Sequence, residues 1–223
     1  MKPRILACCC ALLLAGCTAQ HPGIAASGSA APTGASAPAS PGSRGGGSNV
    51  PRTYQEACEQ SGYCTGATGR VPERLVRPLH FPELADSRCP GSPARYVSAP
   101  AFGSMALGTG LVRVGVDATP AHGGLRAGHT DFPGWRALKT HFFSFPAYRG
   151  PFLVRAQRLD RAGPVRLGGS PAGGGPLVVP PGSGWREVPY FTFFRSPGCY
   201  GWQVDGLTFS EIVVARVLPP REP

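Results

Sequence analysis

The sequence predicts an all-β protein, an antiparallel β-sandwich of the immunoglobulin-like kind with about seven to eight strands, preceded by a disordered tether. Short runs rich in Val, Phe, Tyr and Leu are separated by Gly, Pro and Asp, which is the pattern of strands joined by turns. After Pro93, no stretch keeps a helical period for ten residues without a glycine or a proline. The runs that we assign to strands are 105–116, 136–145, 151–159, 164–168, 176–180, 190–195, 199–204 and 207–217.

Residues 1–16 have the pattern of a secretory signal peptide. Lys2 and Arg4 make the start basic, residues 5–14 are uncharged and apolar, and small residues precede Cys17. The apolar run is too short to span a bilayer as a mature helix. Its three adjacent cysteines cannot converge on one metal ion, so we interpret them as small apolar residues of a segment that is later removed.

The motif Leu-Ala-Gly-Cys at 14–17 resembles the lipobox of bacterial lipoproteins. The resemblance implies that Cys17 carries a diacylglyceryl thioether and begins the mature chain, which would hold the protein on a membrane outside the cytoplasm. An ordinary secreted protein whose cleavage site abuts a cysteine is the alternative. Residues 17–50 are almost entirely Ala, Gly, Ser, Pro and Thr, so we expect them to form a lipid-anchored disordered tether.

The rest of the chain is expected to comprise an irregular, disulfide-bearing segment, 51–92, and the sandwich domain, 93–218. An even number of cysteines in an exported chain predicts two disulfides. Local closure favours a Cys58–Cys64 bridge, which leaves Cys89 to pair with Cys199. A metal site built from the same cysteines is the alternative, but their spacings of 6, 25 and 110 residues fit no zinc pattern.

The segment 199–214 has the clearest local pattern. Asp205 and Gly206 lie between two β runs, which predicts a two-residue type I′ turn. In the preceding strand, Trp202 and its aromatic neighbour Tyr200 share one face, which we expect to be the core face. Cys199 then points away from the core, so its bridge should attach the segment around Cys89 to the exterior or edge of a sheet.

The chain is strongly basic, with a formal net charge of +10 at pH 7, and apart from Lys2 and Lys139 every basic residue is arginine. Two explanations are open: a surface that binds anions, or a GC-rich genome that encodes basic positions as arginine. No cluster of five or six basic residues is present, and we expect no nucleic-acid partner.

The chemistry-bearing motifs do not indicate an enzyme. A Gly-x-Ser-x-Gly nucleophile elbow between strand and helix is missing from the sequence, and so is a phosphate-binding loop with its lysine. We expect no cofactor and no metal. The alternative is an envelope hydrolase or metal-dependent enzyme that uses His122, His129 and Asp131, although glycine-rich surroundings favour an exposed loop for these residues.

The remaining function class is recognition. Trp202 is expected in the core, whereas Trp135 and Trp185 lie at strand entrances beside glycines and are a candidate binding surface. We therefore expect a monomeric, non-catalytic surface lipoprotein that binds a cell-envelope polymer, another envelope component or a partner protein.

Three segments, 135–140, 148–168 and 196–214, also resemble a group of uncharacterised exported bacterial proteins. The shared features are a Trp…Lys-Thr strand, a Gly-Pro…Leu-Val-Arg…Arg-Leu-Asp hairpin and a Pro-Gly-Cys-Tyr…Gln-Val-Asp-Gly ending. The resemblance implies a β-sandwich on the cell surface and carries no activity with it. It does not extend to 51–92.

Overall fold

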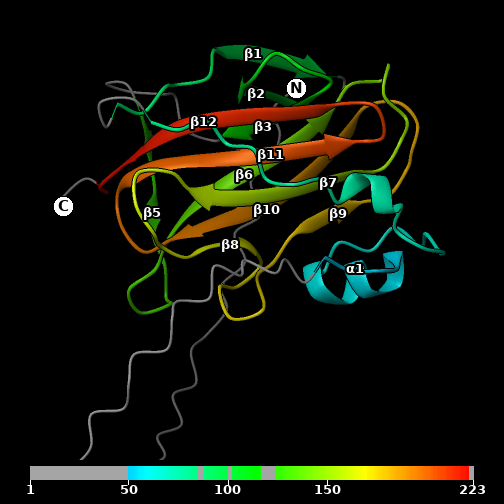
Figure 1. The fold of residues 1–223 in the computed structure, drawn as a ribbon, viewed down its shortest axis with the longest axis horizontal. Coiled ribbons are helices and arrows are strands. Elements are labelled where there is room, and N and C mark those ends of the chain that lie inside the picture. Colours follow the sequence, from blue (N-terminus) through cyan, green and yellow to red (C-terminus); the bar gives the residue numbers. More distant parts are fainter. Residues whose placement is uncertain (1–49, 85–87, 100–101, 117–123, 221–223) are drawn as a thin grey trace, which may run out of the picture. The chain divides into compact units, whose positions relative to one another are not determined.

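The computed structural model describes residues 50–84, 88–99, 102–116 and 124–220. These residues form two packed β-sheets, which confirms the predicted all-β sandwich. Figure 1 shows the five-stranded sheet in front of the seven-stranded sheet, with helix α1 beside strand β9. The predicted signal peptide, Cys17, nearly all of the predicted tether and His122 lie outside the described residues.

The structure assigns twelve strands to the described residues, more than the seven to eight expected, because 105–116 divides into parts of β2 and β3 and because β1, β4 and β5 were not anticipated. The elements are α1 (Tyr54–Ser61), the 3-10 helix η1 (Glu73–Leu75), β1 (Ala94–Ala99), β2 (Phe102–Leu107), β3 (Val112–Val116), β4 (Leu125–Arg126), β5 (Gly128–His129), β6 (Arg136–Ser144), β7 (Phe152–Arg158), β8 (Val165–Gly168), β9 (Leu177–Val179), β10 (Arg186–Phe194), β11 (Gly198–Gly206) and β12 (Ser210–Leu218).

The seven-stranded sheet has the order β1-β2-β3-β6-β10-β8, and β5 pairs with β6. The five-stranded sheet has the order β4-β12-β11-β7-β9. All pairs are antiparallel except β4 with β12. The central pair of the larger sheet, β6 and β10, is in register from Arg136 opposite Phe194 to Ser144 opposite Arg186.

The main core lies between the sheets and follows the two-residue period of the strands. In β11, Tyr200 and Trp202 face this core, as the sequence predicted, and Val204 continues the same alternation. Trp202 is fully buried, and its Nε1 donates to Thr192 Oγ1 at 3.1 Å, so the only polar atom of the ring has a partner.

The segment 50–84 with 88–93, here called the N-terminal cover, packs on the outer side of the five-stranded sheet. Its buried residues Tyr54, Ala57, Val71 and Leu75 form a second apolar cluster with Leu153 of β7 and Val178 of β9. A sheet with one face in the main core thus has much of its other face buried as well, which explains why β7 and β9 carry apolar residues at successive positions.

Within the cover, α1 begins and ends at residues that favour a helix boundary. Thr53 is the N-cap, and its side chain and that of Glu56 each accept a hydrogen bond from the backbone of the other residue, a complete capping box. Gly62 ends the helix in the left-handed conformation, with φ 72°. We expected this segment to be irregular, but its sequence does contain the signal for a helix. That signal is Thr-x-x-Glu at 53–56 followed by Gly62.

Both predicted disulfide pairings are present. Cys58 and Cys64 join across six residues, with their Cα atoms 4.7 Å apart, and Cys89 joins Cys199 across 110 residues, with their Cα atoms 5.4 Å apart. Because Cys199 faces away from the main core, the longer bridge attaches the end of the N-terminal cover to the outer side of β11.

The predicted turn at Asp205-Gly206 is wrong. Strand β11 continues through both residues, with Asp205 opposite Leu153 on one side and Ser210 on the other. The chain reverses at 207–209 instead, and Gly206 is not among the glycines with positive φ that a type I′ turn requires. The physical reason is that the Asp205 carboxylate is fully buried and hydrogen-bonded within the sheet.

Candidate functional site

The side of the seven-stranded sheet that faces away from the main core, here called the outer face, carries two clusters of aromatic rings. In β10 the alternation places Tyr190, Thr192 and Phe194 toward the core and Phe191 and Phe193 on the outer face. Desolvation of the core-facing Tyr190 hydroxyl raises its pKa to about 12. The outer-facing rings instead meet residues from the loop before β6.

The first aromatic cluster on the outer face is centred on Phe193. The rings of Phe132 and Trp135 meet it edge-on, with centroids 5.7 and 6.5 Å away, and the Phe191 ring lies 6.0 Å away. Phe132 is 37% and Phe191 40% exposed, whereas Phe193 is buried. A tight turn holds this arrangement: Trp135 N–H donates to Phe132 O at 3.0 Å, and Gly134 has φ 71°.

Arg195 lies over the Trp135 ring, with its guanidinium carbon 4.3 Å from the ring centroid. The same guanidinium donates to Pro133 O at 3.3 Å. A side chain at position 134 would collide with it, because a Cβ there would lie 2.6 Å from Arg195 Nη1. Trp135 is thus half-buried and has a packing role, and the exposed apolar surface of this cluster belongs to Phe132 and Phe191.

The second aromatic cluster contains Trp185 and Phe145, whose ring centroids are 4.6 Å apart at an interplanar angle of 48°. The guanidinium of Arg113 lies 4.6 Å from the Phe145 centroid. Both rings pack against a small buried group formed by Val97, Ala106 and Phe143. Trp185 is half-buried, like Trp135.

The two candidate tryptophans lie on one face but not in one cluster. Trp135 precedes β6 and Trp185 precedes β10, and these strands are antiparallel, so the two strand entrances lie at opposite ends of the pair. Eight residue steps separate the ends, or about 27 Å at ~3.4 Å per step. Between them lies a polar band in which His141 Nδ1 and Glu187 Oε1 are 2.5 Å apart.

The residues of the alternative metal site are only partly described. His129 ends β5 and Asp131 lies in the following loop, and both are exposed. His122 lies outside the described residues, so the structure does not test the alternative, in which the three side chains converge. Among the residues that the structure describes, no three His, Cys, Asp or Glu side chains are grouped so that they could hold a metal ion.

A buried polar network joins the N-terminal cover to the five-stranded sheet, and sequence reasoning missed it. Asp205 Oδ2 accepts from Arg155 Nη2 at 2.6 Å and from Gln203 Nε2 at 3.0 Å. Gln203 in turn bonds the cover, accepting from His80 N at 3.0 Å and donating to Pro78 O at 3.0 Å. Charged residues inside strand runs, here Arg155 and Asp205, were the only available signal.

A serine and a histidine also meet at this network, but their geometry is not that of an activated nucleophile. The Ser210 hydroxyl donates to Asp205 Oδ1 at 2.6 Å, whereas His80 Nε2 is 3.4 Å from Ser210 Oγ. The hydroxyl proton is therefore directed at a carboxylate that Arg155 already neutralises, and the imidazole is not placed to remove it.

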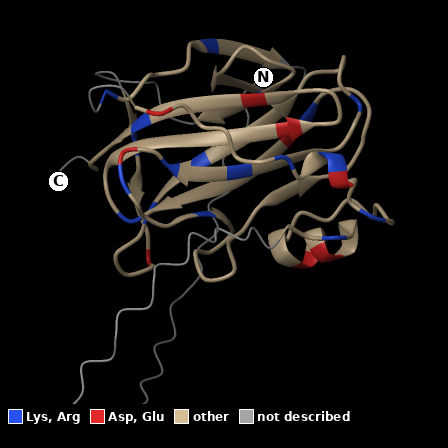
Figure 2. Cartoon of the chain, viewed as in Figure 1, with Lys and Arg blue, Asp and Glu red and all other residues tan. Residues whose placement is uncertain are grey.

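Most arginines of the described residues have structural partners, which adds a third explanation for the arginine excess. Figure 2 shows that the basic residues are spread over the strands and loops of both sheets. Some pair with carboxylates, and others donate to backbone carbonyls of loops, as Arg77 does to residues 206, 207 and 209. Arginines that donate to carbonyls are Arg77, Arg126, Arg136, Arg155, Arg158, Arg166, Arg186 and Arg195.

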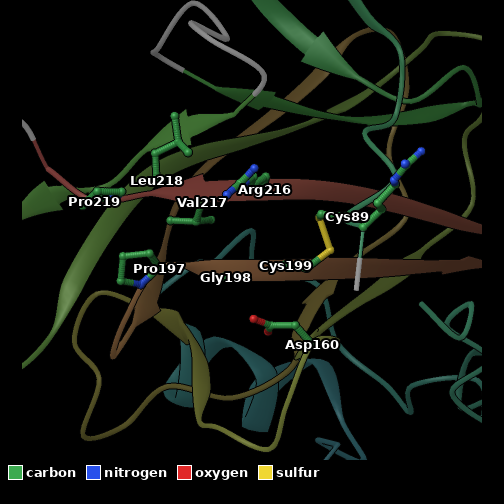
Figure 3. A pocket seen from close by; sticks show the side chains of 10 residues that line it. Cys89, Asp160, Pro197, Gly198, Cys199, Arg216, Val217, Leu218 and Pro219 are labelled. Atoms are coloured by element: carbon green, nitrogen blue, oxygen red, sulfur yellow. A yellow bond between two sulfur atoms is a disulfide. The ribbon is translucent and has the colours of Figure 1, made fainter. Parts of the chain in front are cut away.

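A pocket of about 540 Å³ lies where the cover ends, beside the Cys89–Cys199 bridge. Figure 3 shows the disulfide that joins Cys199 of β11 to Cys89 at the end of the cover, with Asp160 on one side of it and Arg216 of β12 on the other. The hydrogen bond from Arg158 holds the pKa of the Asp160 carboxyl below its usual value.

No protein-family model matches the chain, and no curated protein is significantly similar to it. The likeness of 135–140, 148–168 and 196–214 to a group of exported bacterial proteins therefore stays a prediction, as does the lipobox. In the part of the chain that the structure describes, no helix is both long and apolar enough to cross a bilayer.

Proposed function

We propose that this protein is a lipid-anchored envelope protein that binds a partner without catalysis, and that the outer face is its binding surface. The observation that carries the proposal is the first aromatic cluster, in which the rings of Phe132 and Phe191 are exposed and Arg195 lies over the Trp135 ring. The cover packs on the corresponding side of the other sheet, whereas the outer face keeps the exposed apolar rings of Phe132 and Phe191.

The composition of this surface favours a protein partner. Aromatic residues and arginine are enriched at the centres of protein interfaces, where they carry most of the binding energy. Trp135 is already fixed by Phe193 and Arg195, so little side-chain entropy would be lost when a partner binds. A glycan would use open ring faces, but Arg195 already covers the Trp135 ring.

Site-specific crosslinking in the native cell tests the binding surface. A photoreactive residue at Phe191 should give an adduct of defined mass that disappears when Phe132 is changed to Ser. The matched control is the same probe at Gln55 on the exposed side of α1, which should give no such adduct. A heterogeneous glycan adduct, or equal adducts at both positions, would contradict the proposal.

Fractionation tests the anchor separately. Cys17→Ala should move the protein from the membrane fraction to the soluble fraction, since the acyl chains contribute ~0.8 kcal/mol of membrane affinity per buried methylene. Retention of this variant on membranes would show that something other than a lipid on Cys17 holds the chain.

A further inference from the structure

The corner pocket beside the Cys89–Cys199 bridge has an arrangement of charge that neither packing nor the proposed function uses. It is formed by the end of the cover, the loop after β7, the start of β11 and the end of β12. Two exposed arginines, Arg88 and Arg216, lie in its lining. Among the contacts that the structure describes, neither guanidinium has a carboxylate partner, unlike Arg155 and Arg158.

The disulfide fixes the positions of these two arginines relative to each other. Arg88 precedes Cys89 in the chain, and Arg216 lies opposite Cys199 in the register of β11 and β12. The backbone of Arg88 is thus adjacent to one end of the bridge in sequence, and the backbone of Arg216 is paired with the other end across the sheet. Two cations held in this way on one pocket repel each other unless an anion lies between them.

Among the described residues that line the pocket, the one carboxylate does not neutralise them. Asp160 accepts from Arg158 through both oxygens, at 2.7 Å from Nε to Oδ1 and 3.1 Å from Nη2 to Oδ2. That pair is neutral as a unit, and the neighbouring Arg161 adds a further positive charge at the rim, where it donates to Ser196 Oγ at 3.2 Å. The described residues of the corner therefore carry a net positive charge.

We propose that this pocket binds a phosphate group carried by a larger envelope molecule. Guanidinium groups match the oxygens of phosphate with paired hydrogen bonds, and a phosphate monoester carries about −1.5 to −2 charges at pH 7, against one for a carboxylate. A volume of about 540 Å³ exceeds the size of inorganic phosphate and falls in the range of pockets that enclose a small organic ligand. The site lies on the other sheet from the outer face, so it does not depend on the proposed function.

Titration calorimetry with glycerol 3-phosphate at low salt, on the full chain carrying Cys17→Ala, tests the site directly. We expect binding that weakens about tenfold or more in Arg216→Gln and in Arg88→Gln, because each loses a charge-assisted contact. Arg166→Gln, which removes an exposed arginine of β8, is the matched control and should bind as the parent protein does. Acetate should bind far more weakly than glycerol 3-phosphate.

Asp160→Asn should change the affinity for phosphate in the opposite direction from the arginine variants. Removing this carboxylate frees the charge of Arg158 at the pocket, so phosphate should bind more tightly, whereas a variant that merely loosened the corner would bind more weakly. Co-sedimentation with phosphatidylglycerol and phosphatidylcholine vesicles then separates the sources. Arg216-dependent binding to the anionic vesicles indicates a lipid headgroup, and binding of the soluble phosphate alone indicates a polymer or metabolite.

Three results would overturn the proposal. These are an absence of phosphate binding, equal losses in Arg216→Gln and Arg166→Gln, or acetate bound as tightly as glycerol 3-phosphate. Any of them would return Arg88 and Arg216 to the status of solvated surface residues. Loss of crosslinking at Phe191 with phosphate binding intact would instead refute the proposed function alone.

Discussion

Arg155 and Asp205 form a buried ion pair beneath the N-terminal cover, with Nη2 and Oδ2 2.6 Å apart and side-chain exposures of 7% and 0%. The guanidinium also donates to Arg77 O in the cover at 2.5 Å. The pair thus satisfies polar groups on both sides of the contact between the cover and β7 and β11. It fixes where the cover lies more specifically than apolar contacts alone would do.

Asp205→Ala should lower the free energy of unfolding by about 3–5 kcal/mol, because it leaves the Arg155 charge buried without a partner. The double variant Arg155→Met/Asp205→Leu should lose less than the sum of the single changes. Urea unfolding measures these differences, with Asp131→Asn as the control because Asp131 is exposed. If the loss of unfolding free energy in the double variant equals the sum of the losses in the two single variants, the pair is not energetically coupled.

Removing the Cys89–Cys199 bridge should destabilise the fold more than removing Cys58–Cys64. In the chain-entropy model the 110-residue loop is worth about 5 kcal/mol and the six-residue loop about 2 kcal/mol. The paired changes to serine avoid free thiols and are compared by urea unfolding. Equal losses for both pairs would point to strain or to residual structure in the unfolded chain.

Trp202→Ala should cost about 3–5 kcal/mol, as for other large aromatic side chains truncated in a core. It leaves a cavity and also removes the donor to Thr192 Oγ1. Phe191→Ala on the outer face, where the ring is 40% exposed, is the comparison and should cost much less. Melting curves of the two variants measure the contrast, and similar losses would contradict the assignment of the outer face as a surface.

The parts of the fold that depend on a local period were predictable. Alternation in β11 correctly placed Trp202 in the core and Cys199 outside it, and loop length favoured the observed disulfides. Both inferences use residues a few positions apart. Predicting that Trp135 and Trp185 lie at opposite ends of one face required the pairing of β6 with β10, which no local pattern contains.

Burial of charge was not predictable for the same reason. Asp205 beside Gly206 has the local chemistry of a turn, and only Arg155, 50 residues away, makes a buried carboxylate acceptable there. The cover residues Arg77 and His80, which complete the network, are more than 120 residues from Gln203 and the 207–209 loop. The corner pocket likewise combines the end of the cover with three distant segments.

Asp160→Asn should destabilise the protein at neutral pH and have a smaller effect as the pH falls. The hydrogen bond from Arg158 lowers the pKa of Asp160 in the folded state below the unperturbed value of 3.8. Over the interval between the two pKa values the unfolded chain binds the proton first, so the stabilisation is fully present above pH 3.8 and is lost as the pH falls through the lower, folded pKa.

Urea unfolding of the parent and Asp160→Asn chains from neutral to strongly acidic pH measures this loss. The two stabilities should converge at the acidic end, where the carboxyl of the parent protein is protonated in both states. Asp131→Asn, at an exposed loop position, controls for the general effect of removing a negative charge from a basic protein. A difference that stays constant across the whole range would mean that Asp160 stabilises the corner by shape and neutral hydrogen bonds. In that case the Asp160 carboxylate would not compensate the charge of Arg158 in the parent protein. Asp160→Asn would then leave the charge at the pocket as it was, and the expected gain in phosphate affinity would not occur.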